Sequence, residues 1–511
     1  MTTPGSLQRN PSAAAEREYD LIVVGGGIYG VMLAFEASAR GVSVLLLERD
    51  DFGSATSFNS LKTIHGGLRH LQRLNLRQHR LFVNERRWFL QQFPDLVQPL
   101  PVLMPLYNAG LRRPGVMRMA LTIDHLLSVD RNRGLPAHRS IPRGTIISAS
   151  EVKRLYPDVE TRGLGAGALW FDACMPDSHR LIIEVLRATC RADSVVLNYV
   201  SASDLMTAGG RVVGVYAVDH VDGTELGFKA PLVVNAAGPW SRDVGRAFDR
   251  DHPELFRFSV AWNVLLDREA LSDHALAVAP SHAGGQVYFL HPWKGRLLIG
   301  TGHASRDALS QEPDPSEAEL RTFLDDINDS VPGIALTTDD ILHVFSGFLP
   351  VKRERTTELT SDSSIVDHGK AGGPTGLFSV AGNRFTASRN TAHRLVSRLF
   401  PGLADHGAAG IPRDETIGKR TAETGYAYEW WPEQLDASTR EMLKRTIAEE
   451  AVMHLDDLIL RRTSIGDNPA RALALAAELS TLFEWDQPRR RQELQRINTH
   501  FSWMSTDCYS E

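Results

Sequence analysis

The 511-residue sequence contains very little cysteine. Its thiols are Cys174, Cys190 and Cys508, which are too few and too widely spaced for a disulfide framework, a CxxC redox pair or a cysteine-rich zinc site. Sparse cysteine of this kind is typical of proteins from a reducing compartment. We therefore expect a cytoplasmic protein without structural disulfides.

Long hydrophobic runs are also absent. No stretch approaches the roughly 18 to 20 apolar residues that a membrane-spanning helix needs. Residues 1–18 carry proline, serine and charges but no apolar core of signal-peptide length, and we interpret them as a flexible leader. Neither a secreted precursor nor an integral membrane protein is expected.

Neither sign of charge is in large excess. Lysine and arginine number 56 against 62 aspartates and glutamates, a net charge of −6, which gives no general attraction to nucleic acid. Histidines and acids occur without metal-ligand spacing such as HExxH. We predict no nucleic-acid partner and no metal.

The bulk composition is that of a globular protein. Hydrophobic residues make up 42 % and charged residues 23 % of the chain, which allows a large core. The length suggests about two to four compact units.

A nucleotide-binding pattern begins at Leu21. Residues Leu21–Val24 form a buried apolar strand, a GxGxxG motif follows, and the apolar-periodic segment Val31–Ala39 predicts a helix. Val42–Leu47 then predicts a second buried strand, which ends at Glu48. The whole is a βαβ unit of the kind that binds dinucleotides.

Each part of this motif has a physical role. The first glycine permits a tight turn, the second lets the backbone approach a pyrophosphate, and the third lets helix and sheet pack closely; they are Gly25, Gly27 and Gly30. Glu48 would accept hydrogen bonds from the adenosine ribose, and an acid here disfavours a 2′-phosphate. FAD or NAD is therefore expected rather than NADP; the alternative is a structural glycine turn with a surface glutamate.

A second motif lies downstream, in SATSFNSLKTIHGGLRH (residues 54–70). Small hydroxyl side chains such as those of Thr56 and Ser57 can bind phosphate and ribityl oxygens, and Gly66 and Gly67 let a backbone pass against a flat ring. Here the sequence resembles the FAD-dependent glycerol-3-phosphate dehydrogenases and oxidases, within the D-amino-acid-oxidase-like flavoproteins. The resemblance extends through GGGIYG (25–30), LLLERDDFGSATS (45–57), KTIHGGLRHL (62–71), DACMPDSHRL (172–181), VVNAAGPWS (233–241), FSGFLP (345–350) and SVAGNRFTASR (379–389).

This resemblance implies FAD as the cofactor and an α/β fold. It implies a discontinuous Rossmann-like FAD-binding domain (19–95, 160–250 and 341–405), an antiparallel-sheet substrate-binding domain (96–159 and 251–340) and a C-terminal helical domain (406–511). The residues that it implies for the cofactor are Gly25, Gly27, Gly30, Glu48, Thr56, Ser57, His65, Gly66, Gly67, Leu68, Ala237, Gly238, Trp240, Gly382, Asn383, Arg384, Phe385 and Thr386.

Candidate catalytic residues follow from the chemistry of alcohol oxidation. A hydride leaves carbon for flavin N5 while a base takes the hydroxyl proton, and His65 is our candidate base; the alternative is a core histidine bonded to backbone. Arg69 and Arg384 are candidate partners of an anionic substrate group, or else structural ion-pair partners.

The chain departs from the family pattern where substrate would bind. His70 stands where the family has tyrosine, Leu349 replaces an arginine before proline, and Asn263 replaces a histidine. We therefore expect oxidation of a hydroxyl-bearing, anionic small molecule other than plain glycerol 3-phosphate. The alternatives are an amine or amino-acid oxidase of the superfamily and a flavin-binding scaffold without turnover.

The sequence leaves open the electron acceptor (oxygen, quinone or another protein), a covalent flavin link and the oligomeric state. One segment bears on membranes: Leu111–Ser128 combines arginines with apolar residues at helical spacing. It fits either peripheral contact with the inner membrane face, as in the family's respiratory members, or packing on its own domain.

Overall fold

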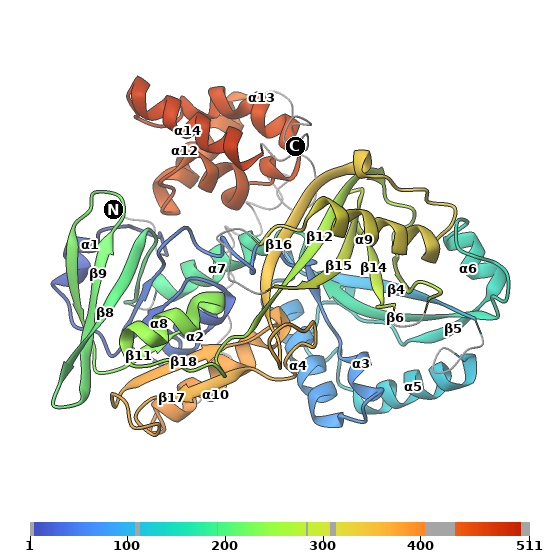
Figure 1. Ribbon diagram of the computed structural model, residues 1–511, viewed down its shortest axis with the longest axis horizontal. Coiled ribbons are helices and arrows are strands. Elements are labelled where there is room, and N and C mark those ends of the chain that lie inside the picture. Colours follow the sequence, from blue (N-terminus) through green and yellow to red (C-terminus); the bar gives the residue numbers. More distant parts are fainter. Residues whose placement is uncertain are drawn as a thin grey trace.

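The computed structural model describes residues 5–107, 113–191, 193–282, 285–306, 313–403 and 435–501. Figure 1 shows two sheet-containing parts side by side, with a cluster of C-terminal helices above them. No described helix is both long and apolar enough to cross a membrane.

The first part is built on a six-stranded sheet. Its strand order is β17 (Ser364–Asp367), β18 (Leu377–Ala381), β11 (Val233–Asn235), β1 (Leu21–Val24), β2 (Val44–Leu47) and β7 (Val195–Leu197). All neighbours are parallel except β17 and β18. Strands β1 and β2 are buried along their whole length. Side chains on one face, such as Val23 and Leu46, pack against helices, and those on the other face, such as Ile22 and Leu45, pack against a small antiparallel sheet. Because both faces are covered, the strands have uninterrupted apolar sequences.

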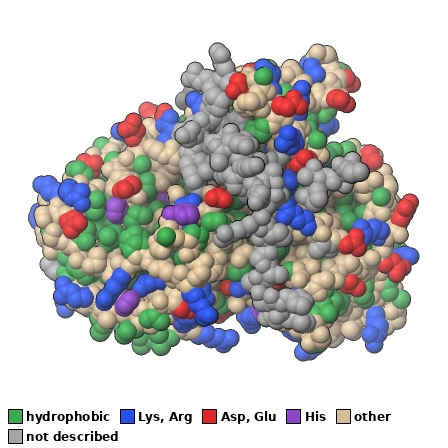
Figure 2. Space-filling view, turned by 180° about the vertical axis from the view of Figure 1, so that it is seen from behind, with side chains coloured by type: hydrophobic (Ala, Val, Ile, Leu, Met, Phe, Trp, Pro, Cys, Tyr) green, Lys and Arg blue, Asp and Glu red, His purple; other side chains and the backbone are tan. Residues whose placement is uncertain are grey.

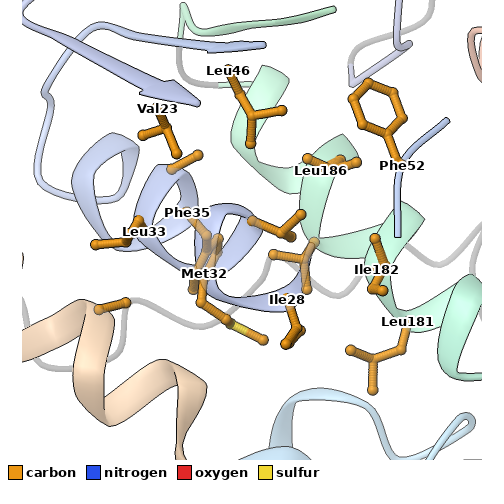
Figure 3. Close-up of a cluster of buried hydrophobic side chains, with 14 of the residues drawn as sticks. Val23, Ile28, Met32, Leu33, Phe35, Leu46, Phe52, Leu181, Ile182 and Leu186 are labelled. Atoms are coloured by element: carbon orange, nitrogen blue, oxygen red, sulfur yellow. The ribbon is translucent and has the colours of Figure 1, made fainter. Parts of the chain in front are cut away.

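Helix α2 (Ile28–Ser38) is the central helix of this part. It packs against α7 (Ser178–Cys190) and α10 (Ser388–Leu399). Figure 3 shows Ile28 and Met32 of α2 grouped with Ile182 of α7 in one apolar cluster. This packing fixes the N-terminal end of α2 against the sheet.

Smaller elements complete this part. Helix α8 (Ser241–Phe248) follows the short helix η3 (Gly238–Trp240), and a three-stranded antiparallel sheet is formed by β8 (Val200–Ala208), β9 (Arg211–Asp219) and β10 (Glu225–Lys229).

The second part contains a nine-stranded sheet. Its strands are, in order, β16 (Ile341–Pro350), β12 (Phe258–Glu269), β15 (Arg296–Ser305), β14 (Tyr288–Trp293), β13 (Ala275–Val278), β4 (Gln98–Leu106), β6 (Ala166–Cys174) and β3 (Thr63–Ile64), with β5 (Thr145–Ser148) paired to β6. The helices around it are α3 (Leu68–Leu71), α4 (Leu76–Gln92), α5 (Pro114–Leu127), η2 (Ala137–Arg139), α6 (Ala149–Leu155), α9 (Glu317–Ser330) and η4 (Thr338–Asp340).

The predicted boundaries between the two parts need correction. Strands β3, β6 and β16 were assigned by sequence to the FAD-binding segments, but they pair within the nine-stranded sheet. Sequence pattern predicts a strand without its partner, and β6 pairs with β4 and β3 over long sequence separations.

The predicted flexible leader is wrong for residues 5–18. Residues Pro11–Ala15 form helix α1, the Leu7 N–H donates to the Glu449 carbonyl at 2.7 Å, and Arg9 pairs with Asp219. The Leu7 side chain is buried. Such isolated anchors leave no periodic signal in sequence.

The C-terminal part is helical where it is described. It contains α12 (Ala437–Glu449), a π-helical turn η6 (Asp457–Arg462), η7 (Ile465–Asp467), α13 (Pro469–Ser480) and α14 (Gln487–His500). Residues 404–434 and 502–511 of the predicted helical domain lie outside the described residues. A separate apolar cluster joins these helices to β12, β15 and β16.

Candidate active site

Two glycines of the turn between β1 and α2 have no space for a side chain. Gly25 has a φ of +110°, and a Cβ there would lie 2.6 Å from the Ala236 carbonyl oxygen; at Gly30 it would lie 1.9 Å from the Gly25 oxygen. Gly27 is the N-cap of α2. The turn therefore brings bare backbone and the positive end of a helix dipole to the cavity, as an anionic pyrophosphate requires.

Glu48 closes this turn from the end of β2. Its carboxylate accepts hydrogen bonds from the Gly26 N–H at 2.5 Å and the Asp50 N–H at 2.9 Å. Burial, with the nearby Asp50 charge, raises the pKa of Glu48 to about 7. The side chain is thus held in place by backbone donors at one end of the cavity.

The hydroxyl residues of the second motif lie between the start of α2 and strand β16. The Ser57 hydroxyl accepts from the Ile28 N–H at 2.9 Å, at the start of α2, and the Thr56 hydroxyl donates to the Phe348 carbonyl at 3.0 Å. Both residues line the cavity. This loop therefore joins the glycine turn to strand β16.

Two further turns approach the same space. The turn that follows β11 places Ala237, Gly238 and Trp240 at the cavity, with the Arg49 guanidinium 4.1 Å from the Trp240 ring. The turn from β18 into η5 (Phe385–Ala387) contributes residues 382–386. At Gly382 a Cβ would lie 2.1 Å from the Tyr29 hydroxyl, so this position also admits only glycine.

These elements enclose one large cavity of about 930 Å³. Its lining runs from Glu48 and the glycine turn to α3 and α5. Of the residues predicted from sequence, only Gly30 and Gly66 do not line it; Gly30 lies under the turn, and Gly66 faces Arg86. A space of this size with a glycine-lined, acid-capped end fits a dinucleotide cofactor with room for a small substrate.

His65 lies at the cavity wall and pairs with Asp172. Its Nδ1 is 3.2 Å from Asp172 Oδ2, and its backbone N–H donates to the Thr386 hydroxyl at 3.0 Å. Antiparallel pairing of β3 with β6 sets this contact, because Ile64 lies opposite Ala173. An imidazole that donates from Nδ1 keeps Nε2 as a proton acceptor.

Asp172 is a buried carboxylate. It also accepts from the Gly66 N–H at 2.7 Å. Burial raises the pKa of Asp172, but the hydrogen bonds from His65 and the Gly66 N–H and the charge of Arg86 outweigh this and hold the pKa below its usual value. The acid therefore stays ionised and orients the imidazole. Asp172 begins one of the segments that resemble the family, but the sequence alone assigned this residue no role.

Arg69, His70 and Arg384 form a positively charged group at the cavity. Arg384 Nη1 lies 3.0 Å from His70 Nε2, and its guanidinium stands 5.3 Å from the Phe82 ring. Burial lowers the pKa of Arg384, and the Arg69 charge adds to this effect. Among the described residues neither arginine has an acidic ion-pair partner, so the structural alternative proposed for them is not supported.

His70 is a neutral member of this group. Burial, together with the charges of Arg384 and other neighbours, lowers the pKa of His70 to about 4. Its ring is therefore uncharged at pH 7 and accepts the Arg384 hydrogen bond. The ring packs on Phe82 at 4.7 Å between centroids.

The two other divergent positions also line the cavity. Asn263 on β12 is held by two bonds: its amide donates to the Asn59 carbonyl at 2.9 Å, and its oxygen accepts from the Thr301 hydroxyl at 3.0 Å. Leu349 on β16 is half-buried and presents an apolar surface.

Sequence reasoning missed His303. This residue lines the cavity from β15, and its Nε2 lies 2.5 Å from the Ser259 hydroxyl. Burial lowers the pKa of His303 to about 4, so it is a neutral polar group. His303 lies near the end of β15, which runs to Ser305, beyond the apolar residues that mark a strand in the sequence.

Comparison with known proteins agrees with this geometry. Residues 20–398 match the family model described as FAD dependent oxidoreductase. The chain is 28 % identical to a glycerol-3-phosphate dehydrogenase of Synechocystis sp. over 77 % of this chain and 72 % of that one. It is 27 % identical to the mitochondrial glycerol-3-phosphate dehydrogenase SDP6 of Arabidopsis thaliana, over 95 % and 86 %.

Solved structures show the same fold. The glycerol-3-phosphate dehydrogenase from Bacillus halodurans, complexed with FAD, superposes with a TM-score of 0.70 at 21 % identity and covers 96 % of this chain and 95 % of that one. The L-proline dehydrogenase from P. horikoshii is more distant, with a TM-score of 0.54 at 14 % identity over 76 % and 96 %. The family match covers most of the chain, and the chain therefore belongs to the FAD dependent oxidoreductase family.

Proposed function

We propose that this flavoprotein oxidises the hydroxyl-bearing carbon of a small anionic molecule. The observation that carries the proposal is that the His65–Asp172 pair and the Arg69 and Arg384 cations face the cavity that holds the nucleotide motif. When bound, FAD supplies the hydride acceptor at flavin N5. The relatives named for glycerol 3-phosphate support a polyol phosphate as the first candidate substrate.

The chain's own residues suit FAD. The glycine turn and the start of α2 would bind the pyrophosphate, and Glu48 would bind the adenosine ribose. The turn at residues 382–386, the hydroxyls of Thr56 and Ser57, and the stretch from His65 to Leu68 would surround the rest of the cofactor. Of the residues predicted to bind the cofactor, all but Gly30 and Gly66 border the cavity.

His65 would act as the general base. The substrate C–H bond breaks with its electron pair leaving as hydride, while His65 Nε2 takes the hydroxyl proton, so an alcohol becomes a carbonyl. Asp172 holds the tautomer that leaves Nε2 free and stabilises the imidazolium that forms. This division of roles follows from the single 3.2 Å contact between the two side chains.

Arg69 and Arg384 would bind the anionic group of the substrate. Two cations without acidic partners among the described residues, inside a cavity, favour an anion, because it relieves their mutual repulsion and their desolvation. His70 holds the Arg384 guanidinium through a neutral nitrogen. Leu349, in contrast, gives part of the cavity wall an apolar surface, which suits a substrate with more carbon than glycerol 3-phosphate.

The test is anaerobic reduction of the flavin-loaded protein. Glycerol 3-phosphate is added first, then a panel of longer hydroxy-acid and polyol phosphates, and bleaching near ~450 nm is recorded. Bleaching by a hydroxyl compound with formation of a carbonyl supports the proposal. Bleaching by amines or amino acids alone, with ammonia released, would replace it with an amine oxidase; no bleaching by any compound would favour a binding scaffold.

We also propose peripheral contact with a membrane through α5. This helix buries Met117 and Leu121 but exposes Met119 by 60 % and Leu126 by 66 %, beside Leu74, which is 82 % exposed. Met119 and Leu74 border the cavity. Helix α5 lies at the lower right of Figure 1 and therefore on the lower left side in the reversed view of Figure 2. Along that edge Figure 2 shows apolar and basic side chains intermingled.

Such a surface suits an amphipathic helix on an anionic membrane. It would also bring the cavity mouth close to a lipid-soluble electron acceptor. Flotation with vesicles of anionic lipid tests it: wild type should float, Met119→Ser with Leu126→Ser should not, and the double change Val213→Ser with Tyr216→Ser on exposed strand β9 should float like wild type.

A further inference from the structure

Three side chains from two separate segments meet outside the cavity. Asp249 follows α8, His252 lies in the next turn, and His368 follows β17. Asp249 Oδ2 lies 2.9 Å from His368 Nδ1 and 3.5 Å from His252 Nε2, and the three atoms all lie within 4.8 Å of one another. The side chains are 7 %, 8 % and 0 % exposed for Asp249, His252 and His368.

His252 carries an unsatisfied nitrogen in this group. Its Nδ1 lies 3.1 Å from Glu254 Oε1 and so donates a proton to that carboxylate. Its Nε2 is buried and has no hydrogen-bond partner among the described residues. In the tautomer with its proton on Nδ1, the Nε2 lone pair faces the Asp249 carboxylate at 3.5 Å, and a cation bound between the two would stabilise this arrangement.

The outer contacts of the group resemble those of a metal site. Metal-ligating imidazoles usually donate their second N–H to a carboxylate or another acceptor. His252 does so to Glu254, and His368 Nε2 lies 2.9 Å from the Ser379 hydroxyl. Gly373 lets backbone pass close by, since a Cβ there would lie 2.4 Å from Asp249 Oδ2.

The nearby arginine of the described chain does not contact the Asp249 oxygen that faces the two imidazoles. Arg250 Nε contacts the other carboxylate oxygen, Asp249 Oδ1, at 3.2 Å, and its side chain is half exposed. A second cluster, His454, Asp456 and Glu493, differs in this respect, because Arg461, Arg489 and Arg496 already neutralise its acids.

We propose that Asp249, His252 and His368 bind one divalent transition-metal ion of the Zn²⁺ type. Two imidazole nitrogens with one carboxylate oxygen suit Zn²⁺ and exclude Mg²⁺ and Ca²⁺, which need mostly oxygen ligands. A water molecule would complete the tetrahedron. Asp249 and His368 are 119 residues apart in the sequence, so no spacing motif reveals the group, and the proposal departs from the sequence-based prediction of no metal.

The position of the ion gives it a structural role. None of the three ligands borders the cavity, but they join the end of α8 to the β17–β18 hairpin. From His368 a chain of contacts runs through Ser379 to Asn235, whose side chain accepts from the Ala237 N–H at 3.2 Å. The ion would therefore brace the turn that borders the cofactor cavity.

The experiment is Zn²⁺ titration calorimetry on the chelator-treated flavoprotein, with bound metal counted by elemental analysis. Wild type should bind one equivalent. Asp249→Asn and His252→Asn should each weaken that binding by more than about 100-fold, and Glu254→Gln, an exposed outer contact, by about 10- to 100-fold. In His252→Asn the new amide can still donate to Glu254, so weaker Zn²⁺ binding by this variant is due to the missing Nε2 ligand.

The control is His274→Asn, which removes the partly exposed imidazole beside Asp273 and should bind like wild type. Flavin absorbance and circular dichroism confirm that each variant is folded. The proposal is overturned if wild type binds no equivalent of Zn²⁺, or if Asp249→Asn and His252→Asn bind it as tightly as wild type does. The result does not depend on turnover and so is separate from the fate of the proposed function.

Discussion

The Asp172 carboxylate holds the His65 imidazole and the backbone beside it with its two oxygens. Oδ2 lies 3.2 Å from His65 Nδ1, and Oδ1 accepts from the Gly66 N–H at 2.7 Å. One buried acid therefore fixes both the tautomer of the candidate base and the loop that carries it. His65 is not a packed core histidine, because 44 % of its side chain is exposed.

Replacing His65 by Asn should lower the rate of flavin reduction by about 10²- to 10⁴-fold, the usual contribution of a general base. Asp172→Asn should lower it as well, since the amide no longer favours the tautomer with a free Nε2. Anaerobic stopped-flow absorbance measures both. A His65→Asn rate close to that of wild type, with FAD still bound, would mean that another group takes the proton.

Loss of either cavity arginine should weaken substrate binding. A charged hydrogen bond contributes about 1.5 to 3 kcal/mol, so Arg384→Met or Arg69→Met should raise the substrate Kd about 10- to 100-fold. Arg77→Met is the matched control, because Arg77 is exposed and does not border the cavity. Titration of the flavin spectrum with substrate gives the constants, and equal values for Arg384→Met and the control would refute the anion site.

FAD affinity should depend on pH through Glu48. Burial raises the pKa of this carboxyl to about 7, so Glu48 is protonated below that pH when FAD is not bound. Because the folded-state pKa is raised, the contribution of Glu48 to folding stability falls as pH rises from about 4.5 to 7. Binding both ribose hydroxyls needs the carboxylate. The Kd for FAD should therefore rise about tenfold for each pH unit below 7.

Fluorescence quenching of FAD, followed from about pH 5.5 to 8.5 on either side of the Glu48 pKa, measures this dependence. Glu48→Gln should bind FAD weakly at every pH and lose the slope, whereas Glu18→Gln, an exposed position that does not border the cavity, should behave as wild type. A wild-type Kd that is flat across this range would show that Glu48 binds the ribose in its neutral form or does not contact it.

Leu349→Arg tests whether position 349, where the glycerol-3-phosphate dehydrogenase pattern has arginine, faces the phosphate of a bound substrate. The change places a cation at the cavity wall and should tighten binding of glycerol 3-phosphate by about 10- to 100-fold. Leu349→Met, which keeps the wall apolar, is the control. If Leu349→Arg binds glycerol 3-phosphate no better than Leu349→Met, this wall does not face the phosphate.

The sequence predicts the cofactor site better than the substrate site, for physical reasons. The glycine turn is local: Gly25, Gly27 and Glu48 lie within one βαβ unit, so spacing alone defines it. The contact between His65 and Asp172 spans 107 residues and depends on pairing of β3 with β6, which no local pattern encodes. The same holds for the group of Asp249, His252 and His368. The apolar residues that mark β15 in the sequence end at Ile299, whereas the strand runs to Ser305, and His303 was missed for that reason.

Buried ion pairs attach the C-terminal helices to the first part. Replacing Arg462 tests how much one of these pairs stabilises the fold. Arg462 and Asp51 are both fully buried and form a bidentate pair, with Nη1–Oδ2 of 2.7 Å and Nη2–Oδ1 of 2.8 Å. Although burial opposes it, the charges of Arg462 and Arg461 hold the pKa of Asp51 below its usual value. Arg462→Met leaves the carboxylates of Asp51 and Asp457 with the Arg461 cation between them.

Removing one member of a buried pair typically costs about 3 to 5 kcal/mol, whereas an exposed pair contributes about 0 to 1 kcal/mol. Urea unfolding at pH 7 should therefore show a much larger loss for Arg462→Met than for Arg17→Met, which breaks the exposed pair with Asp193. Because the pKa of Asp51 is depressed, the stabilisation is present at neutral pH and is lost as pH falls below about 4. The difference between wild type and Arg462→Met should accordingly shrink in acid, and equal costs for the two variants at pH 7 would show that the buried Arg462–Asp51 pair stabilises the fold no more than an exposed pair does.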